Sequence, residues 1–414
     1  MSRAIDAVRD AASSLRRQRA GRRRPHLVLV TPWPPQQSGI AGYSARLARE
    51  LARFVDVEVV VSGPVGDYEA PQQRGVRLIS ATEPGTSEWL RGRQHVLYCM
   101  GNSGFHGHVY TLLREHPGAV LLHDVQLTGF FGAFAGTQRP GDPDGWLLEQ
   151  VERHYGGEMP REQLRRSMLS SLERDARGIY MTAEISRFAQ RLFVHSRFAA
   201  DVVAHDRGRS VPVTVMPFGV PPAAAHGGGA PTTQTPLIVH MGALSETKST
   251  AALIEAFGAV QRRHPGTRLV LAGSADESGP AHWEALAREH APAGSIEISG
   301  YVDEERYETL LRTADLAVQL RAISNGEASA AVADCLAAGL PTIVTDLGWT
   351  GELPRDAVRH ITPEPPAPLL AEQIDALIAD PRERAELSAG ALAFARQHSF
   401  ATVAQAYLRE FGLV

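Results

Sequence analysis

Short apolar runs alternate with segments of helical spacing along most of this chain, and this alternation restricts the possible folds more than any other feature. Residues 26–31 form a continuous apolar run bounded by proline, which is typical of a strand buried on both faces of a sheet. Strands that alternate with helices form βαβ units, so the pattern predicts parallel sheets. The expected strands are 26–31, 57–61, 95–100, 119–123, 192–194, 213–216, 237–241, 268–272, 296–299, 316–320 and 341–345. The expected helices are 44–54, 250–263, 304–313 and 329–338, and the charged segment 145–189 is also predicted to be helical.

Length and one segment of unusual composition divide the pattern into two domains. A single hydrophobic core stops growing at about 250–300 residues, and this chain has 414. Residues 221–236 are rich in proline, glycine and hydroxyl side chains and lack periodicity, as linkers do. The predicted fold class is therefore α/β, with two Rossmann-like, doubly wound domains, 25–220 and 237–395, that face each other across a cleft. A terminal helix, 396–414, can cross back to the first domain.

Composition excludes several classes of protein. The net charge of −4 provides no general attraction for nucleic acid, and no run approaches the ~20 apolar residues of a membrane span. The N-terminus lacks a signal-peptide core, so we expect a cytoplasmic protein. Cys99 and Cys335 lie in hydrophobic segments without metal-ligand spacing, which predicts buried thiols in a reducing compartment.

The basic extension at the N-terminus, residues 1–24, has two interpretations. Apolar residues at helical spacing precede a cluster of arginines, a pattern compatible with a helix drawn to an anionic membrane surface. That interpretation would place the protein at the inner membrane surface. The alternative is a soluble helix followed by a solvated linker. We favour the alternative, because the apolar face is small and rich in alanine.

A glycine-containing loop follows the first predicted strand. Gly39 and Gly42 allow a ligand to approach the backbone, and the helix that follows offers N–H groups to an anion. The spacing is not GxGxxG, so NAD binding has little support. A structural turn explains this loop equally well.

Polar residues also end two later strands of the first domain. His123 and Asp124 follow the apolar run 119–122, at the edge where doubly wound folds bind ligands, and we weigh a functional role above a structural one. The segment 101–106 ends the preceding strand and can line the same cavity. The alternative for His106 and His108 is an ordinary position on the surface.

The second domain carries two further segments. Lys248 lies in the turn that begins at Gly242, where its charge can neutralise a diphosphate leaving group. The order of a Walker loop is absent, and an exposed lysine remains the simpler interpretation of this fragment alone.

The segment around Glu327 is the most specific one in the chain. A glycine-containing loop leads to a helix for which Ser329 is the expected cap. Glu327 and Asp334 are seven residues apart, about two helical turns, so their side chains can project the same way. One carboxylate can hold sugar hydroxyls and the other ribose hydroxyls, with helix N–H groups on a phosphate between them. The alternative is that both acids are solvated. The apolar residues on either side of Asp334 in the sequence disfavour this alternative.

Several of these segments occur in the order in which one known family carries similar segments. The sequence contains SGIAGYS, GNSGFH, LLHD, FVHS, MPFGV, ISGYVDEERYETLLRTADLAVQLR and NGEASAAVADCLAAGLPTIVTDLGWTGELP. Together they resemble the retaining GT-B glycosyltransferases of family GT4, most closely the branch with bacterial mannosyltransferases of O-polysaccharide synthesis. The resemblance covers about residues 25–411. It implies transfer of a sugar from a nucleotide diphosphate to an acceptor hydroxyl, with retained anomeric configuration, no metal and no cofactor besides the donor.

The resemblance also implies roles for individual residues. His123 would lie beside the transferred sugar, Lys248 would stabilise the departing diphosphate, and Glu327 would bind sugar hydroxyls. Asp334 would take the ribose-binding position. The remaining donor-binding residues implied are Gly39, Ile40, Gly242, Ser245, Tyr301, Val302, Arg321, Asn325, Gly326, Ala328 and Ser329.

The sequence departs from the family pattern at two points. The family has two glutamates separated by seven residues, whereas six residues separate Glu327 from Asp334. An alignment on Asp334 puts Gly326 at the first glutamate, and we favour Glu327 as its functional equivalent. The arginine that usually follows the glycine of the second domain is Ala243 here, which leaves more of the phosphate neutralisation to Lys248, with Arg321 as a hypothetical substitute.

The donor and the acceptor stay open at the level of sequence. The resemblance favours GDP-mannose, although a UDP-sugar is the other candidate donor. The acceptor is a glycan, a glycolipid or a small natural product. Two alternative functions are a nucleotide-sugar epimerase of GT-B-like fold and a non-catalytic scaffold that binds a nucleotide sugar. Asp142 and Asp144 match a metal-binding DxD superficially, but they lie in a turn-rich segment and we interpret them as a turn.

Overall fold

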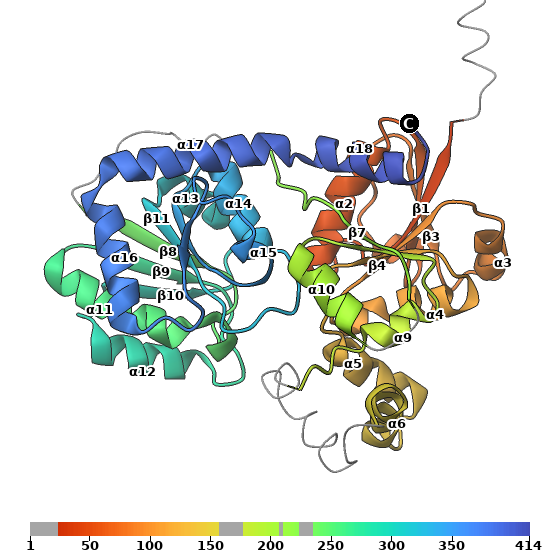
Figure 1. Ribbon diagram of the computed structural model, residues 1–414, viewed down its shortest axis with the longest axis horizontal. Helices are drawn as coiled ribbons and strands as arrows, with labels where there is room; N and C mark the ends of the chain where they lie inside the picture. Colours follow the sequence, from red (N-terminus) through yellow and green to blue (C-terminus); the bar gives the residue numbers. More distant parts are fainter. Residues whose placement is uncertain (1–23, 157–176, 207–209, 223–234) are drawn as a thin grey trace, which may run out of the picture.

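The computed structural model describes residues 24–156, 177–206, 210–222 and 235–414. It contains two α/β domains, each built around a parallel sheet with helices on both faces (Figure 1). The predicted fold class is therefore confirmed. Residues 1–23 of the basic extension and most of the linker lie outside the described residues. No described helix is long and apolar enough to cross a membrane.

The first domain holds a seven-stranded sheet with the order β3-β2-β1-β4-β5-β6-β7, and all its strand pairs are parallel. Its strands are β1 (His26–Val30), β2 (Asp56–Val61), β3 (Val76–Ser80), β4 (Val96–Met100), β5 (Ala119–Leu122), β6 (Arg191–Val194) and β7 (Val213–Val215). Its helices are α2 (Gly39–Leu51), α3 (Thr86–Arg91), α4 (Gly107–Glu115), α5 (Thr128–Gln138), α6 (Pro143–Tyr155), α9 (Thr182–Ser186) and α10 (Arg197–His205), with 3-10 turns η1 (Val65–Asp67) and η2 (Gly104–His106).

The second domain holds a six-stranded parallel sheet with the order β10-β9-β8-β11-β12-β13. Its strands are β8 (Leu237–Met241), β9 (Arg268–Ala272), β10 (Ile296–Gly300), β11 (Leu316–Gln319), β12 (Thr342–Thr345) and β13 (Arg359–Ile361). The helices are α11 (Thr250–Arg263), α12 (Pro280–His290), α13 (Glu304–Thr313), α14 (Ala330–Ala338), α15 (Gly348–Gly351), α16 (Ala367–Ala379), α17 (Pro381–Gln397) and α18 (Phe400–Glu410), with the 3-10 turn η3 (Glu246–Lys248).

The strand order reverses direction once in each sheet. In the first domain the reversal lies between β1 and β4, and in the second it lies between β8 and β11. Loops that leave neighbouring strands in opposite directions open a crevice at such a point, beyond the carboxyl ends of the strands. The topology therefore predicts two ligand-binding edges, one in each domain.

The last two helices connect the domains. α17 packs against α14 in the second domain, and α18 lies on α2 of the first domain (Figure 1). Tyr407 and Leu408 of α18 are fully buried in the core cluster that also contains Leu47 and Leu51 of α2. A parallel bridge between Val220 and Ser399 adds backbone pairing at the crossing. Apolar burial thus holds the end of the chain on the first domain.

Two local predictions were wrong, and a third, the helical segment 145–189, is confirmed only in part. The helix expected at 44–54 begins at Gly39, because Ser38 caps it by accepting a hydrogen bond from the N–H of Ile40. The pair Asp142 and Asp144 opens α6 instead of forming a turn, since the Asp142 side chain accepts from the N–H of Gly145. Within 145–189, α6 ends at Tyr155 and the short α9 follows later, while residues 157–176 lie outside the described part of the chain.

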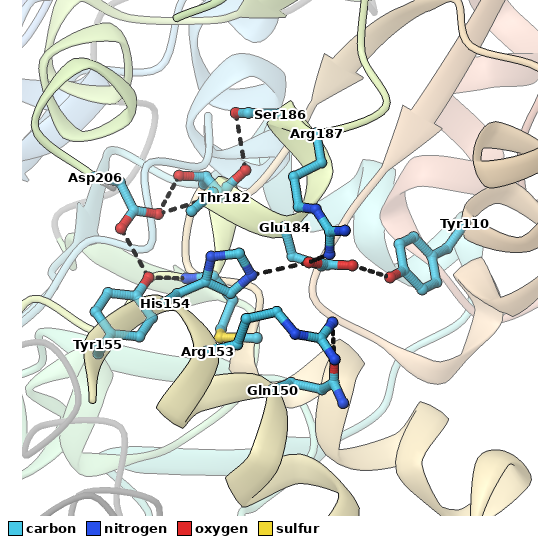
Figure 2. Close-up of polar contacts among 12 residues, drawn as sticks. Tyr110, Gln150, Arg153, His154, Tyr155, Thr182, Glu184, Ser186, Arg187 and Asp206 are labelled. Atoms are coloured by element: carbon cyan, nitrogen blue, oxygen red, sulfur yellow. Dashed lines mark hydrogen bonds and ion pairs between the residues drawn. The ribbon is translucent and has the colours of Figure 1, made fainter. Parts of the chain in front are cut away.

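A polar cluster holds α6, α9 and α10 together beside the sheet of the first domain (Figure 2). The buried carboxylate of Glu184 accepts from the Tyr110 hydroxyl at 2.8 Å and lies 2.8 Å from both Nε2 of His154 and Nη1 of Arg187. Two hydroxyls and a backbone N–H converge in the same way on Asp206. Buried carboxylates are tolerated when they have such partners, so the cluster explains how charged residues occupy this position.

Close helix packing in the second domain requires glycine at position 258. A Cβ atom added to Gly258 of α11 would lie 2.2 Å from the carbonyl oxygen of His290, at the end of α12. We expect Gly258→Ala to lower the free energy of unfolding by about 1–3 kcal/mol through overpacking. Gly136→Ala is the matched control, because that helical glycine of α5 has no atom within 4 Å of an added Cβ and alanine favours a helix. Calorimetric unfolding of both variants tests this, and equal melting temperatures would contradict it.

Candidate active site

A cavity of about 530 Å³ lies between the domains, at the carboxyl ends of both sheets. The first domain contributes the start of α2 and the loops after β4 and β5, and the second contributes the loop between β11 and α14 together with α14 itself. Seven of the residues predicted to bind the donor line it: Gly39, Ile40, His123, Asn325, Glu327, Ala328 and Asp334. Residues from both halves of the sequence thus meet in one cavity.

The imidazole of His123 is a buried wall of this cavity. The residue is only 5% exposed, and Tyr43 meets its ring edge-on, with the ring centroids 5.0 Å apart. Its Nδ1 lies 3.3 Å from Nε2 of His195. Burial, followed by the neighbouring His195 and His106, holds the pKa of His123 well below its usual value. The side chain is therefore neutral at neutral pH.

Asp124 belongs to the same wall, although it was not among the residues predicted to bind the donor. The N–H of Asn102 donates to its Oδ2 at 2.9 Å, and a Cβ on Gly101 would lie 3.0 Å from that oxygen. Burial raises the pKa of Asp124 to about 6, against the opposing effects of that hydrogen bond and of Arg321 and Lys248. The sequence indicated a functional role for Asp124 through its position beside His123 at a strand end, but no role in donor binding.

Two cations of the second domain face Asp124. The turn that carries Lys248 is joined to the loop after β11, because the N–H of Ala322 donates to the carbonyl oxygen of Thr247 at 3.0 Å. Burial and the nearby Arg321 lower the pKa of Lys248 to about 7, while Asp124 raises it. Burial also lowers the pKa of Arg321 to about 10. Two partly desolvated cations side by side form a site suited to an anion.

Glu327 lies next to these cations. One carboxylate oxygen forms an ion pair with Nη1 of Arg321, and the other, Oε2, has no hydrogen-bond partner among the described residues. The helix begins only at Ala330, with the Ser329 hydroxyl accepting from Val332, so the cap was predicted correctly. Glu327 precedes the helix. It lines the same cavity as Asp334, as predicted, but not because the two residues are spaced along one helix.

The glycine next to Glu327 lies against the first domain. Gly326 has a φ of +77°, and a Cβ there would lie 2.3 Å from Cγ2 of Val125 in the first domain. The carbonyl oxygen of Asn325 accepts from the N–H groups of Val125 at 2.6 Å and of Gln126 at 3.1 Å. Because the two domains touch through backbone here, no side chain fits at position 326. In this loop the acidic residue is Glu327, one position later.

Asp334 lines the outer part of the cavity from α14. The Tyr307 hydroxyl donates to its Oδ2 at 2.8 Å. Burial raises the pKa of Asp334, while this hydrogen bond and Arg46 of the first domain lower it. One carboxylate oxygen is thus already engaged by α13.

Several predicted residues lie outside the lining of this cavity. Tyr301 is 80% exposed in the loop after β10, and Val302 packs against the core of the second domain. The N–H of Ser245 donates to the Thr250 hydroxyl at 3.1 Å, which occupies it within its own turn. Gly242 belongs to the same turn, where it adopts a φ of +124°. Four further predicted residues do not line the cavity: Lys248, Arg321, Gly326 and Ser329.

The interpretation of His106 as a surface residue was wrong. His106 is fully buried, with Nδ1 3.0 Å from the carbonyl oxygen of Ser103, and His108 is half-buried against Thr31. Cys99 and Cys335 are both buried free thiols, as the sequence predicted. Within the described ranges no three His, Cys, Asp or Glu side chains gather as a metal site would require.

A second interdomain contact lies beside the cavity. The carboxylate of Glu352, at the end of α15, accepts from the N–H groups of Arg197 at 3.0 Å and Phe198 at 2.8 Å. These N–H groups belong to the first turn of α10, where helix geometry leaves them without intrahelical partners. The contact therefore holds the second domain against the first.

Comparison with known proteins shows that the second domain is similar to one protein family. Residues 226–393 match the family model described as Glycosyl transferases group 1. The match covers most of the second domain and less than half of the chain. No curated protein matches the chain in sequence.

The complete chain is similar in fold to several solved structures. HepE of Anabaena, in complex with UDP and glucose, has a TM-score of 0.64 and 13% identity, over 94% of this chain and 100% of HepE. Sucrose-phosphate synthase of Thermosynechococcus elongatus has a TM-score of 0.63 and 16% identity, over 94% and 100% of the two chains. WaaG, a glycosyltransferase involved in lipopolysaccharide biosynthesis, has a TM-score of 0.59 and 16% identity, over 93% and 99%. The fold is that of the GT-B glycosyltransferases.

The second domain contributes Glu327 and Asp334 to the cavity lining, with Arg321 ion-paired to Glu327 and Lys248 close to Arg321. The first domain contributes His123 and Asp124. The part of the chain that matches the glycosyltransferase family model thus supplies the second domain's share of the cavity lining.

Proposed function

We propose that this chain is a retaining glycosyltransferase that moves a sugar from a nucleotide diphosphate to a hydroxyl of a glycan, a glycolipid or a natural product. The observation that carries the proposal is the buried pair of cations Lys248 and Arg321, of which Arg321 forms an ion pair with Glu327, a residue that lines the cavity. Paired cations suit a diphosphate, and a carboxylate with an unpartnered oxygen in the described part of the site suits sugar hydroxyls. The group 1 family match favours neither the epimerase nor the scaffold.

The proposed reaction is a displacement on one face of the sugar. The acceptor oxygen forms its bond to the anomeric carbon while the bond from that carbon to the diphosphate breaks, and the electron pair leaves with the diphosphate. The leaving phosphate oxygen takes the acceptor's proton on the same face. Lys248 and Arg321 supply positive charge as the leaving group becomes more negative, and the protein contributes positioning otherwise. The proposal includes no metal ion and no cofactor.

We propose two candidate donors, GDP-mannose and a UDP-sugar. The motif resemblance favours GDP-mannose. HepE binds UDP and UDP-glucose, which supports a UDP-sugar as the second candidate. The proposed acceptor lies on the side of the first domain, whose loops differ most among proteins of one fold.

A thermal-shift screen against GDP, UDP, ADP, TDP and their sugar conjugates tests the proposal. A ligand at about 100 times its dissociation constant stabilises a protein by about 2.7 kcal/mol, which shifts the melting temperature measurably. We expect one nucleotide to raise the melting temperature more than the others do. This increase should be smaller in Lys248→Ala. A folded protein that responds to no nucleotide would exclude the proposed donor site.

Nucleotide affinity should fall as pH rises above about 7. Lys248 has its pKa lowered to about 7 in the ligand-free protein, so it loses its proton as pH rises through that value. A bound diphosphate favours the charged lysine, and binding above this pH must therefore take up a proton. We expect the affinity to weaken by up to about tenfold per pH unit between about pH 7 and 9. Titration calorimetry measures it, and Lys248→Arg should flatten the profile because arginine stays charged.

A further inference from the structure

Three groups of the first domain form a chain of polar contacts that ends in the cavity. His195 follows β6, and its Nδ1 lies 3.3 Å from the carbonyl oxygen of Met216. Its Nε2 lies 3.3 Å from Nδ1 of His123. His123 in turn lines the cavity between the domains.

The direction of every hydrogen bond in this chain follows from its first member. A carbonyl oxygen only accepts, so Nδ1 of His195 carries the hydrogen and its Nε2, in the neutral ring, has a lone pair. Nδ1 of His123 must then carry a hydrogen and donate it to His195. This leaves Nε2 of His123 without a hydrogen, as an acceptor.

Nε2 of His123 is also the atom that lacks a partner. It is a buried nitrogen with no hydrogen-bond partner among the described residues. Buried polar atoms are normally satisfied, so an unpaired one in a ligand cavity marks a place where a ligand group binds. The rings are held in place by packing, since Tyr43 lies 5.7 Å and Phe218 lies 5.0 Å from the His195 ring, centroid to centroid.

We propose that His195 is a positioning residue that fixes the tautomer of His123, so that the cavity presents an acceptor nitrogen and selects a sugar hydroxyl that donates to it. The choice of a sugar as the ligand rests on the proposed function, whereas the tautomer does not.

We call the chain of hydrogen bonds from the Met216 carbonyl through His195 to His123 the relay. Both imidazole rings must be neutral for it to form, and both are neutral at neutral pH. Burial lowers the pKa of His195 to about 4, against the opposing effect of the Met216 carbonyl. The groups that face His123 are the rings of His195, Tyr43 and His106, and none of them carries a charge at neutral pH. The opposite tautomer would place a bare Nδ1 of His195 against the Met216 carbonyl, which is repulsive.

The relay makes a prediction about ligand chemistry. A hydroxyl can donate to Nε2 of His123, whereas fluorine at the same carbon cannot donate and a deoxy carbon offers nothing. A site built to hydrogen-bond a hydroxyl discriminates strongly against analogues that lack it. We expect the deoxyfluoro donor that lacks this hydroxyl to bind about 10²-fold more weakly than the natural donor.

Nitrogen NMR of the ligand-free protein tests the tautomer directly. In histidine-labelled protein at pH 7, the ring signals that vanish in His123→Gln should show a protonated Nδ1 and an unprotonated Nε2. His195→Phe keeps an aromatic ring against Tyr43 and Phe218 but removes both polar contacts, so His123 should shift toward the other tautomer. His195→Gln supplies an amide acceptor at the same place and should restore the original signals. A protonated Nε2 in the unchanged protein, or an unaffected His123 in His195→Phe, would overturn the relay.

Ligand discrimination tests the second half of the proposal. The probes are UDP-glucose and GDP-mannose with their monofluoro series, and the readout is the dissociation constant without acceptor. Fluorine at one position should weaken binding to the unchanged protein by about 10²-fold. In His195→Phe the same substitution should weaken binding by about tenfold or less. Equal discrimination in both proteins would refute the role of His195. If neither nucleotide sugar binds, the proposed function fails, and the NMR result still decides the tautomer independently.

Discussion

Lys248→Ala should lower kcat by about 10²–10³-fold, the loss observed when one preorganised electrostatic group is removed from a developing negative charge. Of the two cations, Lys248 is the one available to a ligand, because Arg321 already forms an ion pair with Glu327. The lysine is desolvated beside Arg321, so its interaction with a departing diphosphate is stronger than in water. Initial rates at saturating donor measure the effect.

The controls for Lys248 separate chemistry from folding. The lowered pKa means that burial disfavours the lysine's charge, so its removal should not decrease the melting temperature. Lys248→Arg keeps a cation and should retain more activity than Lys248→Ala at pH 8 and above. Full kcat in Lys248→Ala would show that the diphosphate leaves from another place.

Glu327→Gln should lower kcat/KM by about 10–100-fold for each sugar hydroxyl that the carboxylate binds. A hydrogen bond to a charged group contributes about 1.5–3 kcal/mol, and glutamine keeps the shape while removing the charge. Oε2 of Glu327 has no partner in the described structure, which leaves it available to a hydroxyl. Steady-state kinetics with the donor identified by the thermal-shift screen measure the loss.

Two comparisons distinguish a sugar-binding role of Glu327 from a structural one. Loss of its charge releases Arg321 from the ion pair, so the affinity for the nucleoside diphosphate alone should be unchanged or tighter. Glu289→Gln on α12 is the matched control, because that glutamate is exposed and far from the cavity lining. Weaker binding of the nucleotide without its sugar would place the defect in folding or in the phosphate site.

Local patterns identified most elements of the fold. β8, β9, α11 and α13 begin and end at the predicted residues, because burial on both faces and a regular apolar stripe leave strong periodic signals. β3 and β13 were missed. β3 contains Arg77, and β13 has only three residues, so neither forms the continuous apolar run that indicates a buried strand.

The candidate site was predictable in part for a related reason. His123 and Lys248 follow strands, and topology brings the carboxyl ends of parallel strands to one edge. Asp124 was named beside His123 yet left out of the donor-binding residues, since nothing in sequence indicates that two cations of the other domain face it. The exposure of Tyr301 was equally hidden, because a loop's direction depends on what packs around it.

The sequence by itself determined the two parallel α/β domains, the residues at their strand ends and the cap of α14. Those features depend on hydrophobic periodicity and on hydrogen bonds within a few residues, which are local properties. Only the tertiary structure decided that Gly326 touches Val125, that Asp124 meets Lys248 and Arg321, and that His195 orients His123. These contacts join segments far apart in the chain, so they depend on how two packed domains and neighbouring strands are placed in space, which no local pattern encodes.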